Sequence, residues 1–136
     1  MVETDLLHHE LTGEIIGAAM EVHGTLGSGF LESVYEAALA IEFDMRDVHY
    51  ERQKNITVLY KGKTAKEFAC DFLVEGKVLV ELKALSVITG AEEAQVLNYL
   101  KGTGVEVGLL INFGQSSLRY RRLVLQRKRI TADDTD

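Results

Sequence analysis

Charged residues interrupt two short apolar segments of the sequence. Asp71 lies in the run FACDFLV, residues 68–74, and Glu81 and Lys83 lie in VLVELKAL, residues 78–85. An isolated charge in an apolar strand is costly unless it is paired, neutralised or bound to a metal ion. Carboxylates that gather beside a backbone carbonyl form a hard oxygen site suited to Mg²⁺ or Mn²⁺. The three charges therefore indicate a site, and an exposed set of cross-strand ion pairs is the alternative.

Strand geometry decides whether the three charges can meet. Glu81 and Lys83 are two residues apart, so they share one face of a strand. Asp71 joins them only if the loop between the two strands holds an odd number of residues. A three-residue loop with Gly76 in the left-handed conformation meets this condition, whereas a two-residue Glu75-Gly76 loop would place the carboxylates on opposite faces. The sequence allows both loops.

A basic run near the C-terminus contrasts with the net charge of −6. Between residues 119 and 129 no residue is acidic, and the basic residues are Arg119, Arg121, Arg122, Arg127, Lys128 and Arg129. The net charge argues against nucleic-acid binding by bulk attraction alone. A basic edge beside an acidic site is nevertheless what a metal-dependent phosphodiesterase needs. We expect Arg119, Arg121 and Arg122 to contact nucleic acid, and a solvated edge strand is the alternative.

Length and composition predict one cytoplasmic domain. A chain of 136 residues with 46% apolar content can bury its own core. No basic and apolar leader opens the sequence, and no apolar run reaches the roughly 18 residues of a membrane helix. The one cysteine, Cys70, excludes an internal disulfide and a cysteine-rich metal site, and we expect it to be buried. The domain is expected to span residues 1–130, followed by a disordered acidic tail over 131–136.

The N-terminal half of the sequence predicts two helices and a meander of strands. Helical spacing of apolar residues indicates a first helix that Thr4 or Asp5 caps and that ends at His23-Gly24. A second helix follows a glycine-rich loop and runs from about residue 30 to 45. Three strands joined by short turns, over 56–60, 67–74 and 78–85, are expected to form an antiparallel meander.

The C-terminal half predicts a third helix and two more strands. Thr89 and Glu92 form a capping-box pattern for a helix that reaches about residue 101. The segment 105–113 is almost continuously apolar, which is typical of a strand covered on both faces, and 118–125 is expected to be an edge strand. The order ααβββαββ predicts a single-domain α/β sandwich, with a mixed sheet flanked by helices.

The charged residues and the third helix together resemble the PD-(D/E)XK nuclease superfamily. Asp71 is followed after nine residues by Glu81-x-Lys83, and then by Gln95-x-x-x-Tyr99 on the predicted helix. Glu-x-Lys alone is a weak signal, but the ordered set is specific. The resemblance spans about residues 10–125 and implies a restriction-endonuclease-like fold.

A second motif resembles a smaller family within that superfamily. The run GFLESVY, residues 29–35, is similar to the namesake motif of the GxxExxY proteins, with Glu32 as its acidic residue. Members of that family often have a histidine where this chain has Glu92. No role for a histidine is therefore carried over to this chain.

The resemblance and the residue types together assign the metal ligands. Asp71 and Glu81 would bind Mg²⁺ or Mn²⁺, and the carbonyl of Leu82 would be a third ligand. Glu32 would bind the metal directly or through water; the alternative is that it only favours its helix N-terminus. A bound metal would polarise the phosphodiester and activate a water.

Three further residues would assist the cleavage. Lys83 would orient the attacking water or stabilise the charge that develops at phosphorus. Gln95 and Tyr99 are one helical turn apart and would position the water, the lysine or the substrate. The alternative is that Gln95 and Tyr99 form a polar rim over the core.

The sequence thus predicts a Mg²⁺-dependent nuclease that cleaves nucleic acid, with DNA as the expected substrate. One alternative is a nucleic-acid-binding module of nuclease fold that has no turnover or needs a partner. The other is a homo-oligomeric interaction protein, such as a homodimer, whose charge cluster is structural. Metal binding and cleavage assays would separate the three.

Overall fold

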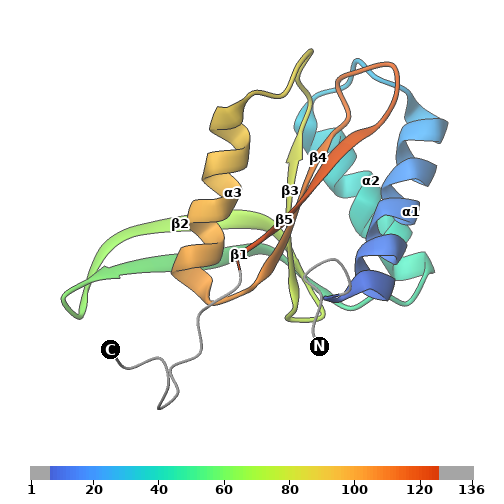
Figure 1. Cartoon of the computed structure of the whole chain (residues 1–136). Helices are drawn as coiled ribbons and strands as arrows, with labels where there is room; N and C mark the ends of the chain where they lie inside the picture. The colour runs from blue at the N-terminus through green and yellow to red at the C-terminus, as the bar shows by residue number, and fades with distance from the viewer. Residues whose placement is uncertain (1–6, 126–136) are drawn as a thin grey trace.

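The order of helices and strands is the predicted ααβββαββ (Figure 1). The computed structural model describes residues 7–125. The elements are α1 (His9–Leu26), α2 (Glu32–Met45), β1 (Tyr50–Tyr60), β2 (Lys63–Val74), β3 (Val78–Lys83), α3 (Gly90–Thr103), β4 (Val107–Asn112) and β5 (Arg119–Val124). The basic residues at 127–129 and the acidic tail lie outside the described residues.

The five strands form one mixed sheet in the order β1-β2-β3-β4-β5. The first three strands are the predicted antiparallel meander. β3 and β4 are parallel, which requires a crossover, and α3 provides it. β5 pairs with β4 in antiparallel orientation and is an edge strand, as predicted. β3 therefore lies at the centre of the sheet.

The predicted ends of the first helix are wrong. α1 begins at His9, and its N-cap residue His8 makes no side-chain cap hydrogen bond within residues 7–125. The expected caps, Thr4 and Asp5, lie outside the described residues. At its other end α1 continues past Gly24, because a glycine in a helix interior costs only about 1 kcal/mol. The helix stops at Gly27, whose φ of 71° suits glycine.

β1 is longer than predicted, because its first half lacks the alternation that marks a strand. The strand begins at Tyr50 rather than Ile56, and its early residues are mostly exposed. Tyr50 fixes this half to α2, since its hydroxyl donates a hydrogen bond to Asp44 Oδ1 (2.8 Å) and can share it with the carbonyl of Ala40 (3.3 Å). In Figure 1 the β1–β2 hairpin extends well beyond the rest of the sheet.

The sheet separates two apolar clusters. α1 and α2 cover one face, where Tyr35 and Phe43 of α2 pack with strand residues that include Phe72, Val80 and Leu109. α3 covers the other face, where its residues pack with Ile56, Cys70, Leu79 and Leu110. Cys70 is buried, as predicted. Over residues 7–125, no helix is both long and apolar enough to cross a membrane.

The apolar side chains of β2 switch from one face of the sheet to the other at Asp71. Cys70 packs with the α3 cluster, whereas Phe72 packs with the α1–α2 cluster, although regular alternation would keep these two residues on one face. The opposite position on β1 is Gln53, which has a φ of 52° and is skipped in the register between Arg52↔Phe72 and Lys54↔Cys70. The hairpin therefore twists out of the sheet at the point where Asp71 lies.

Candidate metal site

Asp71 and Glu81 meet where β2 and β3 separate. The turn between these strands holds three residues, 75–77, and Gly76 has a φ of 67°. This is the odd-numbered loop that the convergence of the two carboxylates requires. The main-chain register ends at Phe72↔Val80. Beyond it the side chains connect the strands: Asp71 N donates to Glu81 Oε1 (2.8 Å), and Leu82 N donates to Asp71 Oδ2 (2.7 Å).

The backbone of β3 directs one more oxygen toward this gap. The carbonyl of Lys83 accepts a hydrogen bond from Phe113 N on the β4 side (2.8 Å). Successive peptide groups of a strand point to alternate sides. The amide and carbonyl of Leu82 therefore point to the β2 side, where its amide contacts Asp71. Two carboxylates and the Leu82 carbonyl thus lie at the same opening.

Burial shifts the protonation of both carboxylic acids. Asp71 and Glu81 are only 7% and 5% exposed. Desolvation, followed by the charge of Asp71, raises the pKa of Glu81 to about 8. Desolvation also raises the pKa of Asp71 to about 6, with the charges of Glu32 and Glu36 adding to the rise and the Leu82 amide opposing it. A cation at this place would favour the ionised form of both groups.

Lys83 lies on the same side as Glu81 and is half-buried. Its charge lowers the pKa of Glu81 and of Glu32, so its ammonium group lies near both carboxylates. Within residues 7–125 it forms no ion pair shorter than 4.0 Å. The lysine is thus close to the carboxylates without being bound to either of them.

Asn112 holds the end of β3 that carries Lys83, and sequence reasoning missed it. Asn112 is fully buried; its Oδ1 accepts from Leu85 N (2.8 Å) and its Nδ2 donates to Leu85 O (2.9 Å). The side chain thereby extends the β3–β4 pairing by one step. A polar residue at the end of a continuously apolar strand is the signal that could have identified it.

The GFLESVY segment positions Glu32 at the start of α2. Tyr35 is fully buried and stacks on Phe113, with the ring centroids 4.6 Å apart. Its hydroxyl donates to Gly27 O (2.5 Å) and accepts from Phe30 N (3.3 Å), so it fixes the loop before the helix. Glu32 is exposed, but the protein around its carboxyl group partly desolvates it, and this desolvation raises its pKa. The charge of Lys83 opposes the rise, and that of Glu36 adds to it. Its charge also raises the pKa of Asp71 and Glu81.

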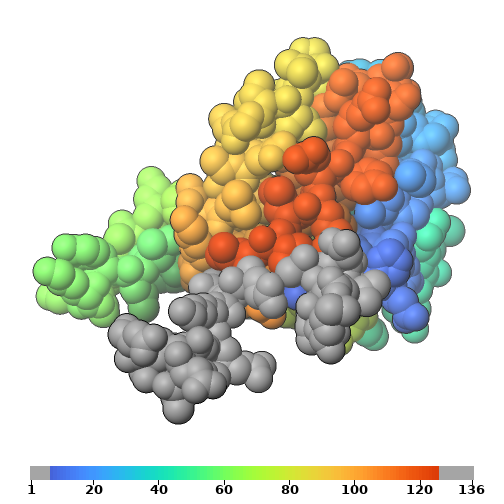
Figure 2. All heavy atoms as spheres, in the orientation of Figure 1, coloured from blue at the N-terminus to red at the C-terminus, as the bar shows by residue number. Residues whose placement is uncertain are grey.

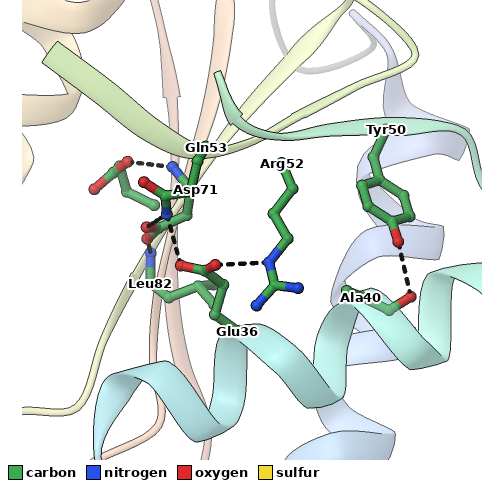
Figure 3. Close-up of polar contacts among 8 residues, drawn as sticks. Glu36, Ala40, Tyr50, Arg52, Gln53, Asp71 and Leu82 are labelled. Atoms are coloured by element: carbon green, nitrogen blue, oxygen red, sulfur yellow. Dashed lines mark hydrogen bonds and ion pairs between the residues drawn. The ribbon is translucent and has the colours of Figure 1, made fainter. Parts of the chain in front are cut away.

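A polar chain links Asp71 to α2, and sequence reasoning missed its members (Figure 3). Gln53 Nε2 donates to Asp71 Oδ1 (3.1 Å) and to Glu36 Oε1 (2.7 Å). Arg52 Nε pairs with Glu36 Oε2 at 2.7 Å. Glu36 follows Glu32 by one turn on α2, which is a helical spacing that could have indicated it. The sequence gives no comparable signal for Gln53, because its role depends on its unusual backbone conformation.

Gln95 and Tyr99 form a hydrogen-bonded pair on α3. Gln95 Nε2 donates to the Tyr99 hydroxyl (3.2 Å). Desolvation raises the pKa of Tyr99, and the charges of Glu81 and Asp71 raise it further. Tyr99 packs with Cys70 and Leu79, which precede Asp71 and Glu81 along their strands, and Gln95 contacts Tyr99.

The three arginines of β5 do not share one face. Arg122 is opposite Leu109, on the α1 side, and its Nη2 donates to the carbonyl of Leu7. Arg121 lies on the α3 side and pairs with Glu93 at 3.3 Å. Arg119 is two residues from Arg121 and shares its face. The predicted basic edge is thus divided between the two faces of the sheet.

The donor set fits a hard divalent cation. Asp71, Glu81 and the Leu82 carbonyl supply three oxygens, and over residues 7–125 Glu81 Oε2 makes no hydrogen bond. No cluster of three or more His, Cys, Asp or Glu side chains suited to a metal ion occurs in that part of the chain. Such a cluster is not required, because Mg²⁺ is usually held by one or two carboxylates with waters completing its shell.

Comparisons with known proteins concern the family and the fold of the chain. The sequence model of the family described as the PD-(D/E)XK nuclease superfamily matches residues 9–123. The crystal structure of a protein called SSO0001 is similar, with a TM-score of 0.56 and 13% sequence identity; the match covers 89% of this chain and 61% of that chain. At that identity the likeness concerns the fold alone, and this chain spans less than two thirds of that protein. No curated protein sequence matches.

Proposed function

Because the chain belongs to the PD-(D/E)XK nuclease superfamily, we propose that it hydrolyses nucleic-acid phosphodiesters, with DNA as substrate and Mg²⁺ or Mn²⁺ as cofactor. The observation that carries the proposal is the convergence of Asp71, Glu81 and Lys83 at the gap between β2 and β3. Members of the superfamily typically use a divalent metal and act on nucleic acid. We further propose, from residues 29–35, that the chain belongs to the GxxExxY branch.

In this proposal the carboxylates and the Leu82 carbonyl hold the metal. Asp71 and Glu81 are the side-chain ligands, and Glu32 contributes directly or through water. The bound metal supplies Lewis-acid activation of the phosphodiester and of a water. Because burial raises the pKa of both ligands, metal affinity should increase with pH as they lose their protons.

The remaining residues act on the substrate and the attacking water. The positive charge of Lys83 lowers the pKa of Glu81, and Lys83 would stabilise the negative charge that develops at phosphorus, or orient the water. Gln95 and Tyr99 would position the substrate strand or the water. Arg119 and Arg121 would hold phosphates on the α3 side, and the proposed phosphate contact of Arg122 would lie on the α1 side.

A cleavage screen tests the proposal. Linear and circular duplex DNA, single-stranded DNA and RNA are incubated with the purified chain and Mg²⁺ or Mn²⁺, with a chelator control and with Glu81→Gln as the matched variant. We expect metal-dependent cleavage that the variant loses. If nucleic acid binds without turnover, the chain is a binding module of nuclease fold. A chain that self-associates but neither binds metal nor cuts would support the interaction-protein alternative.

A further inference from the structure

A groove runs between α3 and the outer part of the β1–β2 hairpin, residues 54–69, which we call the arm. Two hollows of about 600 and 430 Å³ share Val58, Phe68 and Asn98 and so form one continuous groove. On α3 the lining extends from Ala91 to Gly102, a rise of about 16 Å. Figure 2 shows the tip of the arm projecting beyond the rest of the molecule.

The lining of the groove combines apolar, amide and cationic groups. The aromatic ring of Phe68 lies 5.4 Å from that of Tyr99, centroid to centroid, and Val58 extends the apolar surface. The amides of Gln95 and Asn98 face the same space. Aromatic surfaces accept the faces of nucleobases, and amide side chains can bind their edges.

The charge of the groove is positive although the chain is acidic. Lys66 and Lys101 line it, and over residues 7–125 no acidic side chain does. Lys66 Nζ lies 5.9 Å from the centre of the Phe68 ring. The nearest acid along the arm, Glu67, accepts from Thr57 Oγ1 at 3.5 Å and is not part of the lining. The whole chain has 21 acidic and 15 basic residues, so this local charge differs from the average.

The tip of the arm continues this surface. Leu59 and Tyr60 are 62% and 66% exposed, and Lys61 Nζ lies 5.3 Å from the centre of the Tyr60 ring. Lys63 follows the turn. The arm therefore presents a second aromatic ring with lysines beside it, beyond the outer end of the groove.

The inner end of the groove reaches the candidate metal site. Gln95 and Tyr99 line the groove, and Gln95 donates to the Tyr99 hydroxyl. Tyr99 packs in the same apolar cluster as Cys70 and Leu79; Cys70 directly precedes Asp71, and Leu79 lies two residues before Glu81 on the same face of β3. A strand that followed the groove would thus arrive at the carboxylates.

We propose that this groove binds single-stranded nucleic acid and leads it to the site of cleavage. Bases pack against Phe68 and the apolar lining, and phosphates lie near Lys66 and Lys101. A duplex keeps its base faces stacked inside, so it cannot use the aromatic and apolar lining in this way. This inference rests on the proposed nuclease function, whose substrate it specifies as a single strand at the point of entry.

Groove-filling variants test the inference. Ala94→Phe places a large ring at an exposed lining position of α3, and Ala65→Phe places the same ring at an exposed position of the arm outside the lining. Lys66→Gln removes a lining charge, and Lys77→Gln removes the charge of an exposed lysine in the β2–β3 turn. Binding of a fluorescent 12-nucleotide thymidine strand, and of a duplex of equal length, is measured by anisotropy with a chelator present. Circular dichroism and melting temperature confirm folding.

We expect Ala94→Phe to weaken binding of the single strand by about tenfold and Lys66→Gln to weaken it by about threefold, with the two control variants close to wild type. The wild type should prefer the single strand to the duplex. Equal binding of both forms, or wild-type affinity in both groove variants, would overturn the inference.

Because no metal is present, the binding result is independent of cleavage. A protein that binds in the groove without cutting would refute only the nuclease function. A protein that cuts without using the groove would refute only this inference.

Discussion

At the scale of single residues, Glu81 connects the proposed function to stability. Its carboxyl group is buried and has a folded-state pKa of about 8, against an ordinary value of 4.5. Between these two pH values the folded chain binds more protons than the unfolded chain. The free energy of unfolding without metal should therefore be highest at low pH within this range and fall as the pH rises through it.

Glu81→Gln should remove most of this fall. Glutamine keeps the oxygen that accepts from Asp71 N, and its amide nitrogen replaces the oxygen that has no hydrogen bond in the described part of the chain. We expect the variant to be more stable than wild type at pH 8 without metal, by on the order of 2 kcal/mol, and equally stable near pH 4.5. Urea unfolding at the two pH values measures this. A wild-type protein whose stability rises between pH 4.5 and 8 would contradict the assigned burial.

Metal ions should stabilise the wild type more than the Glu81→Gln variant. Mg²⁺ or Mn²⁺ binds the folded wild type at the ionised carboxylates and should raise its melting temperature. Glu81→Gln has lost one ligand and should show a much smaller rise. An equal rise in both proteins, measured by calorimetry over a range of metal concentrations, would remove Glu81 from the proposed ligands.

At the scale of elements, the loop after β3 depends on a close approach of two backbones. A Cβ atom at Gly114 would lie 2.3 Å from Leu85 O and 2.4 Å from Leu85 N. Leu85 is the residue that Asn112 holds, two positions after Lys83. The packing of this loop therefore determines where the lysine is placed.

Gly114→Ala should lower the free energy of unfolding by about 3 kcal/mol and slow any cleavage, because backbone atoms have to move. Gly13→Ala is the matched control: nothing lies within 4 Å of its added methyl group, and alanine in α1 should raise stability by up to about 1 kcal/mol. Chemical denaturation compares the two variants. A Gly114→Ala protein as stable as wild type would contradict the described packing.

The order of elements could be predicted because its signals are local. The Thr89–Glu92 capping box, the apolar run that contains β4 and the turn at Gly76 are each visible over a few residues, and the structure contains all three. Belonging to the superfamily was also predictable, because its motif residues occur in order. The specific likeness to the GxxExxY family stays an interpretation.

The contacts around Asp71 could not be predicted, because they depend on tertiary structure. Gln53 of β1 has a positive φ at the point where the side chains of β2 switch faces of the sheet. No feature of the local sequence marks a positive φ at a glutamine. Glu36 of α2 is linked to Asp71 of β2 by hydrogen bonds through Gln53 of β1. Arg122 belongs to the same basic run as Arg121, and only the pairing of β5 with β4 shows that they face opposite sides.

At the scale of the whole molecule, charge should limit where nucleic acid binds. The chain carries a net charge of −6, so phosphates have to be held by local basic groups. We expect Arg119→Gln and Arg121→Gln to weaken binding and to reduce its salt dependence, because both residues lie on the α3 side of the sheet, as Glu81 and Lys83 do. Arg122→Gln should affect binding less and stability more, since Arg122 contacts the carbonyl of Leu7. Binding isotherms at several salt concentrations rank the three; the strongest loss in Arg122→Gln would contradict this placement.

In the proposed function, Lys83 is a catalytic lysine beside two metal-binding carboxylates. Single-turnover cleavage with saturating protein and Mn²⁺, comparing wild type with Lys83→Ala and with Lys77→Ala as the surface control, tests it most directly. We expect Lys83→Ala to lower the rate constant by at least about 100-fold while substrate affinity stays within a few-fold, and Lys77→Ala to cleave like wild type. Cleavage at the wild-type rate by Lys83→Ala, or no metal-dependent cleavage by the wild type on any substrate, would contradict it.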